Sequence, residues 1–180
     1  VTQAQIVAAL EQLPQVDFRM TINQPTGDFF YDKWVIKDEY KNTVWEELLN
    51  ELPRQKGEAR IIVLPYGKCY QVHADIDDRY HLNLSGTHSY LIDLNTDHMY
   101  KLLLDNYWYT LNAGNLHSAV NFGRTDRVQL VVRHLLKENM LTDSVPVAIL
   151  QTTMDPDDAR FLFDITLSSW FNLANKQGYI

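Results

Sequence analysis

The sequence predicts a mainly β domain with flanking helices, in which a jelly-roll or cupin-like double sheet forms the barrel at the centre. Two observations support this prediction. Between residues 59 and 134, apolar residues alternate with polar ones at a period of two, and turn residues divide the segment into about eight short runs. On either side of this segment, apolar residues recur at helical spacing instead.

Length and composition fit one globular domain. The chain has 180 residues, of which 46% are hydrophobic and 22% are charged, so it can bury a core of its own. We expect a single domain over residues 1–180, with an N-terminal support of helix and strand (1–58), a barrel core (59–134) and a C-terminal helical segment (135–180). The net charge of -7, without a Lys/Arg cluster, argues against nucleic acid as a partner.

Two further features bear on the compartment. Cys69 is the only cysteine, so the chain cannot form an internal disulfide, and a reducing compartment is the simplest interpretation. No apolar run approaches the roughly 18 residues of a membrane span, and no signal peptide follows Val1. We therefore expect a cytoplasmic protein with no membrane partner.

The N-terminal 58 residues are predicted to contain two helices and a strand. Two capping boxes, Thr2 with Gln5 and Thr43 with Glu46, each precede apolar residues at helical spacing. Residues 29–36, between the two helices, are aromatic and β-branched enough to form a strand.

The central segment is predicted to hold eight strands, and a helix follows it. The strands cover residues 60–65, 70–75, 80–85, 89–94, 99–104, 107–112, 116–122 and 128–132. Residues 155–158 then combine a cap, a proline at the first helical position and acidic residues in the first turn. We expect this last helix to pack its wide apolar face against the barrel wall.

The alternation also predicts that the barrel strands have two different faces. The apolar set is Tyr80, Leu82, Leu84, Val128, Leu130 and Val132, and the polar set is Arg79, His81, Asn83, Arg127 and Gln129. Helices at both ends of the chain need an apolar surface to cover. We therefore expect the apolar set to face the helices and the polar set to line the barrel cavity.

His73-Ala74-Asp75 is the candidate metal-binding motif. Its imidazole and carboxylate lie two residues apart, hence on the same side of a strand, and can bind one ion. With His117 from a later strand, they would complete a two-His-one-carboxylate triad, which leaves positions open for a co-substrate and oxygen and suits Fe(II). A His-x-Asp pair alone is a weak signal.

Arg127 strengthens the metal hypothesis. It lies at the start of the last strand, on its polar side, after His117 in the sequence. There a guanidinium can hold one end of a dicarboxylate through a bidentate pair.

In combination, these motifs resemble the aspartyl/asparaginyl β-hydroxylase-like family of 2-oxoglutarate, Fe(II)-dependent dioxygenases. The resemblance covers about residues 60–133, and the residues that carry it are His73-Ala74-Asp75, Arg79-Tyr80-His81-Leu82-Asn83-Leu84, His117-Ser118-Ala119-Val120-Asn121 and Arg127. It implies a double-stranded β-helix fold, with iron bound by the first and the distal histidine, His73 and His117. It also implies that Arg127 binds the far carboxylate of 2-oxoglutarate and that Arg79 and His81 contact this co-substrate.

Two departures from the family pattern are informative. Asp75 supplies an iron-binding carboxylate that some members of the family lack, so the chain is more similar to the hydroxylases of free amino acids such as proline. A serine that binds the co-substrate on the first barrel strand is replaced near Ile62, and the sequence does not say which group takes its role.

The resemblance implies a hydroxylase that acts on an unactivated C–H bond of an amino acid, either free or as an aspartyl, asparaginyl or prolyl residue, and releases succinate and CO2. The expected partners are this small-molecule or peptide substrate and O2, and Arg124 and Asn83 are possible substrate contacts. Two alternatives remain open. One is a metal-dependent cupin-type enzyme that does not use 2-oxoglutarate, and the other is a non-enzymatic jelly-roll binding protein.

The remaining charged residues near these motifs have ordinary structural interpretations. Asp77 and Asp78 are expected to be solvated charges in a loop. Arg133 is expected either to form a structural ion pair or to contact the substrate. His88 and His98 lie among polar residues near strand ends and are expected at the surface.

Overall fold

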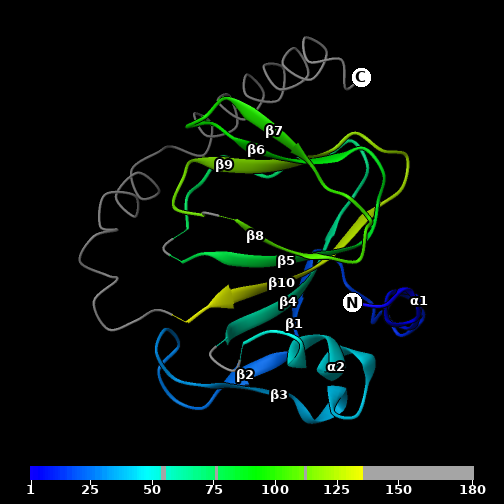
Figure 1. The fold of residues 1–180 in the computed structure, drawn as a ribbon, viewed down its shortest axis with the longest axis vertical. Helices are drawn as coiled ribbons and strands as arrows, with labels where there is room; N and C mark the ends of the chain where they lie inside the picture. The colour runs from blue at the N-terminus through cyan, green and yellow to red at the C-terminus, as the bar shows by residue number, and fades with distance from the viewer. Residues whose placement is uncertain (54–55, 76, 112, 136–180) are drawn as a thin grey trace.

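Two facing β-sheets make up most of the structure, a computed structural model that describes residues 1–53, 56–75, 77–111 and 113–135 (Figure 1). The helices and strands, in chain order, are α1 (Gln3–Glu11), β1 (Arg19–Thr21), β2 (Asn23–Pro25), β3 (Trp34–Ile36), the 3-10 helix η1 (Asp38–Tyr40), α2 (Val44–Asn50), β4 (Lys56–Leu64), β5 (Arg79–Ser85), β6 (Ser89–Asp93), β7 (His98–Lys101), β8 (Trp108–Leu111), β9 (His117–Asn121) and β10 (Arg127–His134). The helix predicted after residue 155 lies outside the described residues. No helix among the described residues has the length and apolarity that a membrane crossing requires.

The order of the strands identifies the fold. One sheet has the order β1-β4-β10-β5-β8, and the facing sheet has the order β7-β6-β9. Residues 69–73 extend the smaller sheet beyond β9 through two isolated bridges, Cys69 with Val120 and His73 with His117. Successive segments thus pass back and forth between the sheets, as in a double-stranded β-helix, and the predicted fold class is confirmed.

Two predicted strands differ in the structure. Residues 70–75 do not form a continuous strand, although His73 forms a bridge with His117 and the backbone of Tyr70 donates to the carbonyl of Ala119 in β9 at 2.9 Å. Of residues 29–36, only β3 is extended, because the Asp28 side chain accepts hydrogen bonds from the backbone of Phe30 (2.8 Å) and Tyr31 (3.1 Å). These local bonds fold the chain into a turn and compete with pairing in a sheet.

The predicted caps are borne out at one helix and altered at the other. Thr2 and Gln5 form the reciprocal box at the start of α1, with hydrogen bonds of 2.8 and 3.2 Å. At α2, Thr43 accepts a hydrogen bond from the backbone of Trp45, but Glu46 accepts from the backbone of Asn42 rather than from that of Thr43. The second prediction of a reciprocal box is therefore wrong, although the helix begins where it was expected.

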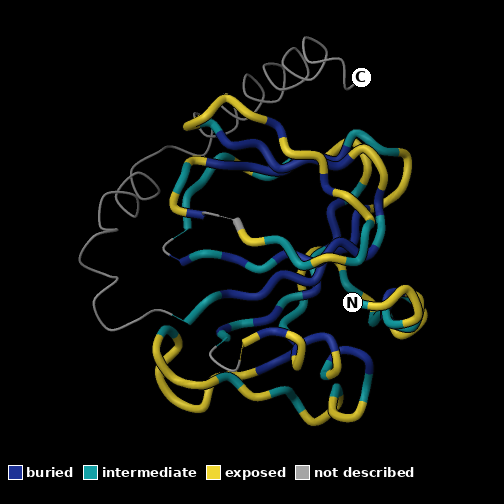
Figure 2. The backbone as a smooth tube through the Cα atoms, in the orientation of Figure 1, coloured by how far each residue is buried: buried dark blue, intermediate teal, exposed yellow. Residues whose placement is uncertain are grey.

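The two faces of the barrel strands are arranged as the alternation predicts. Leu82, Leu130 and Val132 are fully buried in one core cluster with residues of α1 and α2, including Ala9 and Leu48. The polar set, Arg79, His81, Asn83, Arg127 and Gln129, is buried as well. Figure 2 shows β5 and β10 as the buried middle of the larger sheet. The interior of the barrel is consequently polar and charged.

Gly86 brings the chain close to the backbone of Arg127. It has a φ of +105°, and a Cβ added there would lie 2.8 Å from the Cα of Arg127. Gly67 also has a positive φ, +67°, but an added Cβ would meet nothing within 4 Å. Position 86 therefore combines an unfavourable dihedral angle with a steric clash, whereas position 67 has only the first of these.

Gly86→Ala is expected to lower the free energy of unfolding by about 3 kcal/mol, from strain and overpacking together. Gly67→Ala, its matched control, should cost about 1 kcal/mol because only the dihedral angle is unfavourable. Urea unfolding followed by circular dichroism measures both values. Equal losses in the two variants would contradict the close approach of Gly86 to Arg127.

Candidate metal centre

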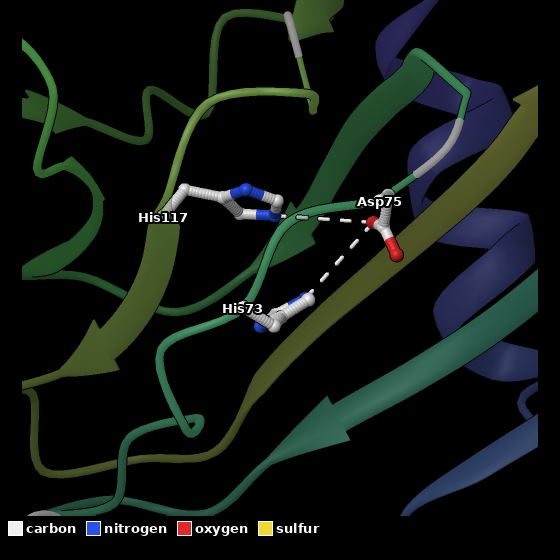
Figure 3. Close-up of side chains that lie close together, drawn as sticks. All are labelled: His73, Asp75 and His117. Carbon is white, nitrogen blue, oxygen red and sulfur yellow. Dashed lines mark ion pairs between the residues drawn. The ribbon is translucent and has the colours of Figure 1, made fainter. Parts of the chain in front are cut away.

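His73, Asp75 and His117 come together at one end of the barrel (Figure 3). The Asp75 Oδ2 atom lies 3.9 Å from the Nε2 atom of His73 and 3.9 Å from that of His117. The ligand atoms of all three side chains lie within 4.8 Å of one another. Metal bonds to nitrogen and oxygen are about 2.0–2.2 Å long, so small side-chain movements would close these three atoms around one ion.

The backbone holds the three residues in register. The backbone N–H of His73 donates to the carbonyl of His117 (3.0 Å), and that of His117 donates to the carbonyl of His73 (2.8 Å). Such a reciprocal pair is the closely hydrogen-bonded unit of an antiparallel ladder. The backbone of Asp75 donates to the carbonyl of Ala113 at 2.7 Å and ties the carboxylate to the segment that precedes β9.

Both imidazoles are oriented by a backbone carbonyl. The Nδ1 atom of His73 lies 2.8 Å from the carbonyl oxygen of Gln71, and that of His117 lies 2.8 Å from the carbonyl oxygen of Asn115. A carbonyl can only accept, so Nδ1 carries a proton in both rings and Nε2 is the nitrogen left to bind a metal. This is the usual second contact of a metal-binding histidine. Three electron-pair donors thus converge on one point, an arrangement that a cation stabilises.

The charge states of the cluster suit a metal ligand set. Burial lowers the pKa of His117, which favours the neutral imidazole. Burial works against ionisation of Asp75, but the neighbouring Arg79 and His73 outweigh it and hold the pKa of this carboxyl below its usual value. His73 and Asp75 are half-buried, so the cluster can be reached from outside the barrel.

Arg79 contacts carboxylates in the structure. Its Nε donates to Asp75 Oδ2 at 3.3 Å, its Nη2 lies 3.1 Å from Asp75 Oδ1, and its Nη1 donates to Asp77. Because all three nitrogens face carboxylates of this chain, the contacts do not favour the expected role of Arg79 in holding 2-oxoglutarate, and that role stays a prediction.

Asp77 is not the solvated charge that the sequence suggested. It is only 3% exposed, and its carboxylate binds both Arg79 and Arg133. These two arginines face each other across β5 and β10, so a buried counter-charge is needed between them. Asp78 is half-buried and accepts from the backbone of Ala113 at 3.3 Å, so it is not fully solvated either.

Arg127 lies deeper in the barrel and is 1% exposed. Its Nη2 donates to the hydroxyl of Tyr70 at 3.2 Å, and its guanidinium carbon lies 5.3 Å from the centre of the Tyr70 ring. Its Nε and Nη1 atoms are buried without a hydrogen-bond partner among the described residues. A buried guanidinium that donates to a neutral hydroxyl and has two further nitrogens unsatisfied is suited to an anion, because unsatisfied buried donors are costly.

His81 is the second interior side chain with unused polar atoms. It is 7% exposed, and neither ring nitrogen has a hydrogen-bond partner within the described part of the chain. Burial lowers its pKa to about 3, and the nearby Arg127 and Arg79 contribute to the shift. His81 is therefore neutral and can donate one hydrogen bond and accept another.

The two expected substrate contacts are placed less favourably. The Asn83 amide donates to the carbonyl of Leu103 (3.0 Å) and accepts from Gln129, so it links parts of the barrel wall. Arg124 is exposed in the turn after β9, beyond the end of that strand opposite to His117. Arg124 does not lie at the metal cluster, and its contact with a substrate stays a prediction.

A cavity of about 500 Å³ opens between the strands β5–β8 and β6–β7, and His81, Leu91, Asp93 and Tyr109 are among its lining residues. Asn115 joins this wall to the metal cluster, because its carbonyl accepts from His117 and its amide donates to Asp93 Oδ2 at 2.8 Å. The cavity thus lies beside the candidate metal centre.

Comparisons with known proteins find likeness only at the level of solved structures. No protein-family model matches the sequence, and no curated protein matches it. An RmlC-like cupin family protein with a double-stranded β-helix fold from Methanocaldococcus jannaschii is 14% identical, with 69% of this chain and 93% of that chain covered and a TM-score of 0.39. A cupin domain from Bordetella pertussis is 15% identical, with 47% and 86% covered and a TM-score of 0.39.

A third similar structure is a predicted oxalate decarboxylase from Thermotoga maritima, which is 23% identical, with 51% of this chain and 74% of that chain covered and a TM-score of 0.37. At these values the likenesses lead to no conclusion about activity, and the fold rests on the strand order of the chain itself. The resemblance to the aspartyl/asparaginyl β-hydroxylase-like family stays a prediction from the motifs.

Proposed function

We propose that the protein is a 2-oxoglutarate- and Fe(II)-dependent dioxygenase that hydroxylates an amino acid, free or in a peptide. The observation that carries this proposal is the pairing of two sites in one barrel. One is the cluster of His73, Asp75 and His117, whose imidazoles are oriented for a metal. The other is the buried guanidinium of Arg127, with two nitrogens that have no partner among the described residues.

The proposal requires a short dicarboxylate to bridge the two sites. Tyr70, which contacts Arg127, precedes His73 by three residues. Three residues of extended chain span at most about 10 Å between Cα atoms, so the contact of the guanidinium and the first metal ligand come from one short segment. We propose that 2-oxoglutarate, a five-carbon diacid, places one carboxylate at each site.

The residues then have the following roles in the proposal. His73, Asp75 and His117 hold the iron through two nitrogens and one oxygen. Arg127 binds the far carboxylate of 2-oxoglutarate by charge-assisted hydrogen bonds, and the Tyr70 hydroxyl supports it there in place of the serine that the sequence lacks. Neutral His81 supplies a further hydrogen bond inside the barrel.

When bound, iron and 2-oxoglutarate together supply oxidative chemistry in which one atom of O2 enters succinate, the other enters the C–H bond of the substrate, and CO2 is released. The chain's own contribution is to orient the reactants and to exclude water. The substrate would bind in the cavity beside His81.

One observation favours the second candidate, a metal-dependent cupin-type enzyme that does not use 2-oxoglutarate. Arg79, an expected co-substrate contact, is engaged by Asp75 and Asp77. Fewer groups are therefore free to bind 2-oxoglutarate than the family resemblance implies.

Anaerobic titration with Fe(II) and then with 2-oxoglutarate separates the two candidates. We expect a weak visible charge-transfer band that requires both components. Tight metal binding without the band would favour the second candidate. If no metal binds, the non-enzymatic jelly-roll binding protein becomes the favoured interpretation. If the band forms, succinate release measured over a panel of amino acids and matched peptides identifies the substrate.

A further inference from the structure

Two buried arginines oppose each other beside the metal cluster. Arg79 on β5 and Arg133 on β10 are direct cross-strand partners, and they are 8% and 4% exposed. Like charges in such positions repel each other. The Asp77 side chain, which is fully buried, compensates them: its Oδ1 accepts from Arg79 and its Oδ2 accepts from the Nε of Arg133 at 2.5 Å.

Arg79 also binds the carboxylate of Asp75. Its Nε is 3.3 Å from Oδ2 and its Nη2 is 3.1 Å from Oδ1, so both oxygens are engaged and the carboxylate plane is defined. Oδ2 is also the oxygen that faces the Nε2 atoms of His73 and His117. One guanidinium thus connects the candidate metal ligand to the buried Asp77.

Apart from the backbone hydrogen bond to Ala113, the contacts with Arg79 are the main restraint on the Asp75 carboxylate. Neither Asp75 nor Asp77 lies in a strand, and the Asp75 side chain is 26% exposed. Arg133, at the other end of the network, is more firmly held than Asp75. The Arg133 guanidinium lies over the rings of Phe29 and Phe30, at 4.3 and 4.9 Å from their centres. The turn between β2 and β3 therefore covers the end of the network.

We propose that Asp77 is a positioning residue of the metal centre, which holds the Arg79 guanidinium against Asp75 and so directs that carboxylate toward His73 and His117. This inference rests on the metal site of the proposed function. It does not depend on 2-oxoglutarate or on the identity of the substrate.

Asp77→Asn tests the inference through metal affinity, with Co(II) as the probe. Loss of an outer partner typically weakens metal binding by about 10–100-fold, and we expect a loss of that size here. The visible spectrum of bound Co(II) should also shift toward that of Asp75→Asn, since both variants disturb the same ligand. Circular dichroism and thermal unfolding of the metal-free proteins show whether the fold is kept.

A charge-matched variant separates positioning from simple electrostatics. Asp77→Asn alone adds net positive charge near the cation, which weakens binding without any change in ligand position. The double variant Asp77→Asn/Arg133→Gln keeps the net charge of the wild type and relieves the repulsion between the arginines, so it also serves if the single variant does not fold. We expect it to bind Co(II) as weakly as the single variant does, with the same shifted spectrum.

Arg133→Gln is the matched single control, because it leaves the Asp77–Arg79 contact in place, and it should retain the wild-type spectrum. Recovery of wild-type affinity and spectrum in the double variant would overturn the positioning role and leave only a charge effect. Wild-type behaviour of Asp77→Asn would overturn it as well. Failure of the wild type to bind Co(II) would instead overturn the metal site itself, so the two failures are distinguishable.

Discussion

His117→Ala is expected to weaken the binding of a divalent metal by more than about 100-fold, because even the loss of an outer partner of a ligand costs about 10–100-fold. Metal-dependent turnover should disappear with it. His117 is buried and already oriented by the carbonyl of Asn115, so the wild-type ring is held in place for binding. Titration calorimetry with Fe(II) under anaerobic conditions, or with Co(II) in air, measures the loss.

Two further variants show whether the loss of affinity is specific to the metal ligands. His73→Ala removes the half-buried ligand of the pair and should have an effect of the same size. His88→Asn is the control, because His88 is exposed and has a φ of 58°, a conformation that asparagine tolerates. Unchanged metal affinity in both His117→Ala and His73→Ala would refute the candidate metal centre, whereas a loss in His88→Asn would point to a general defect of the fold.

Arg127→Gln is expected to raise the 2-oxoglutarate concentration at half-saturation by about 10–100-fold, since each hydrogen bond to a charged group contributes about 1.5–3 kcal/mol. Metal binding in the absence of 2-oxoglutarate should stay close to that of the wild type, because the contact of Arg127 is to Tyr70 and not to a cluster residue. The intensity of the charge-transfer band, measured anaerobically at increasing 2-oxoglutarate concentrations, gives the concentration at half-saturation for each variant.

The control for this prediction is Arg124→Gln, which removes an exposed arginine from the turn between β9 and β10. It should leave the 2-oxoglutarate requirement unchanged. Equal requirements in the wild type and Arg127→Gln would remove the guanidinium from its proposed role and would favour the enzyme that does not use 2-oxoglutarate.

The interior of the barrel was predictable where the strands are regular. Alternation at a period of two placed His81 and Arg127 on the inner face, and the structure shows both as buried. The same period could not find Tyr70. In a regular strand Tyr70 would lie on the face opposite to His73, but residues 70–72 are irregular, and its hydroxyl turns toward Arg127.

The buried charges were harder to foresee. Asp77 stands in a loop next to another acid, and such residues are usually solvated. Only the cross-strand pairing of Arg79 with Arg133 shows why a carboxylate is required between them. Pairing of this kind depends on strand register, which local sequence patterns do not define. Predicting Asp77 would have needed the register of β5 against β10 first.

The reciprocal backbone bridge between His73 and His117 has a consequence for folding. It joins segments that lie far apart in the sequence, so the ligand set is complete only after β9 has docked beside residues 69–73. A cation bound there acts as a cross-link, in a chain whose single cysteine cannot supply one of its own. At a hundred times its dissociation constant, such an ion would add about 2.7 kcal/mol to the free energy of unfolding by mass action. Resistance to heat would then rise and fall with the metal supply.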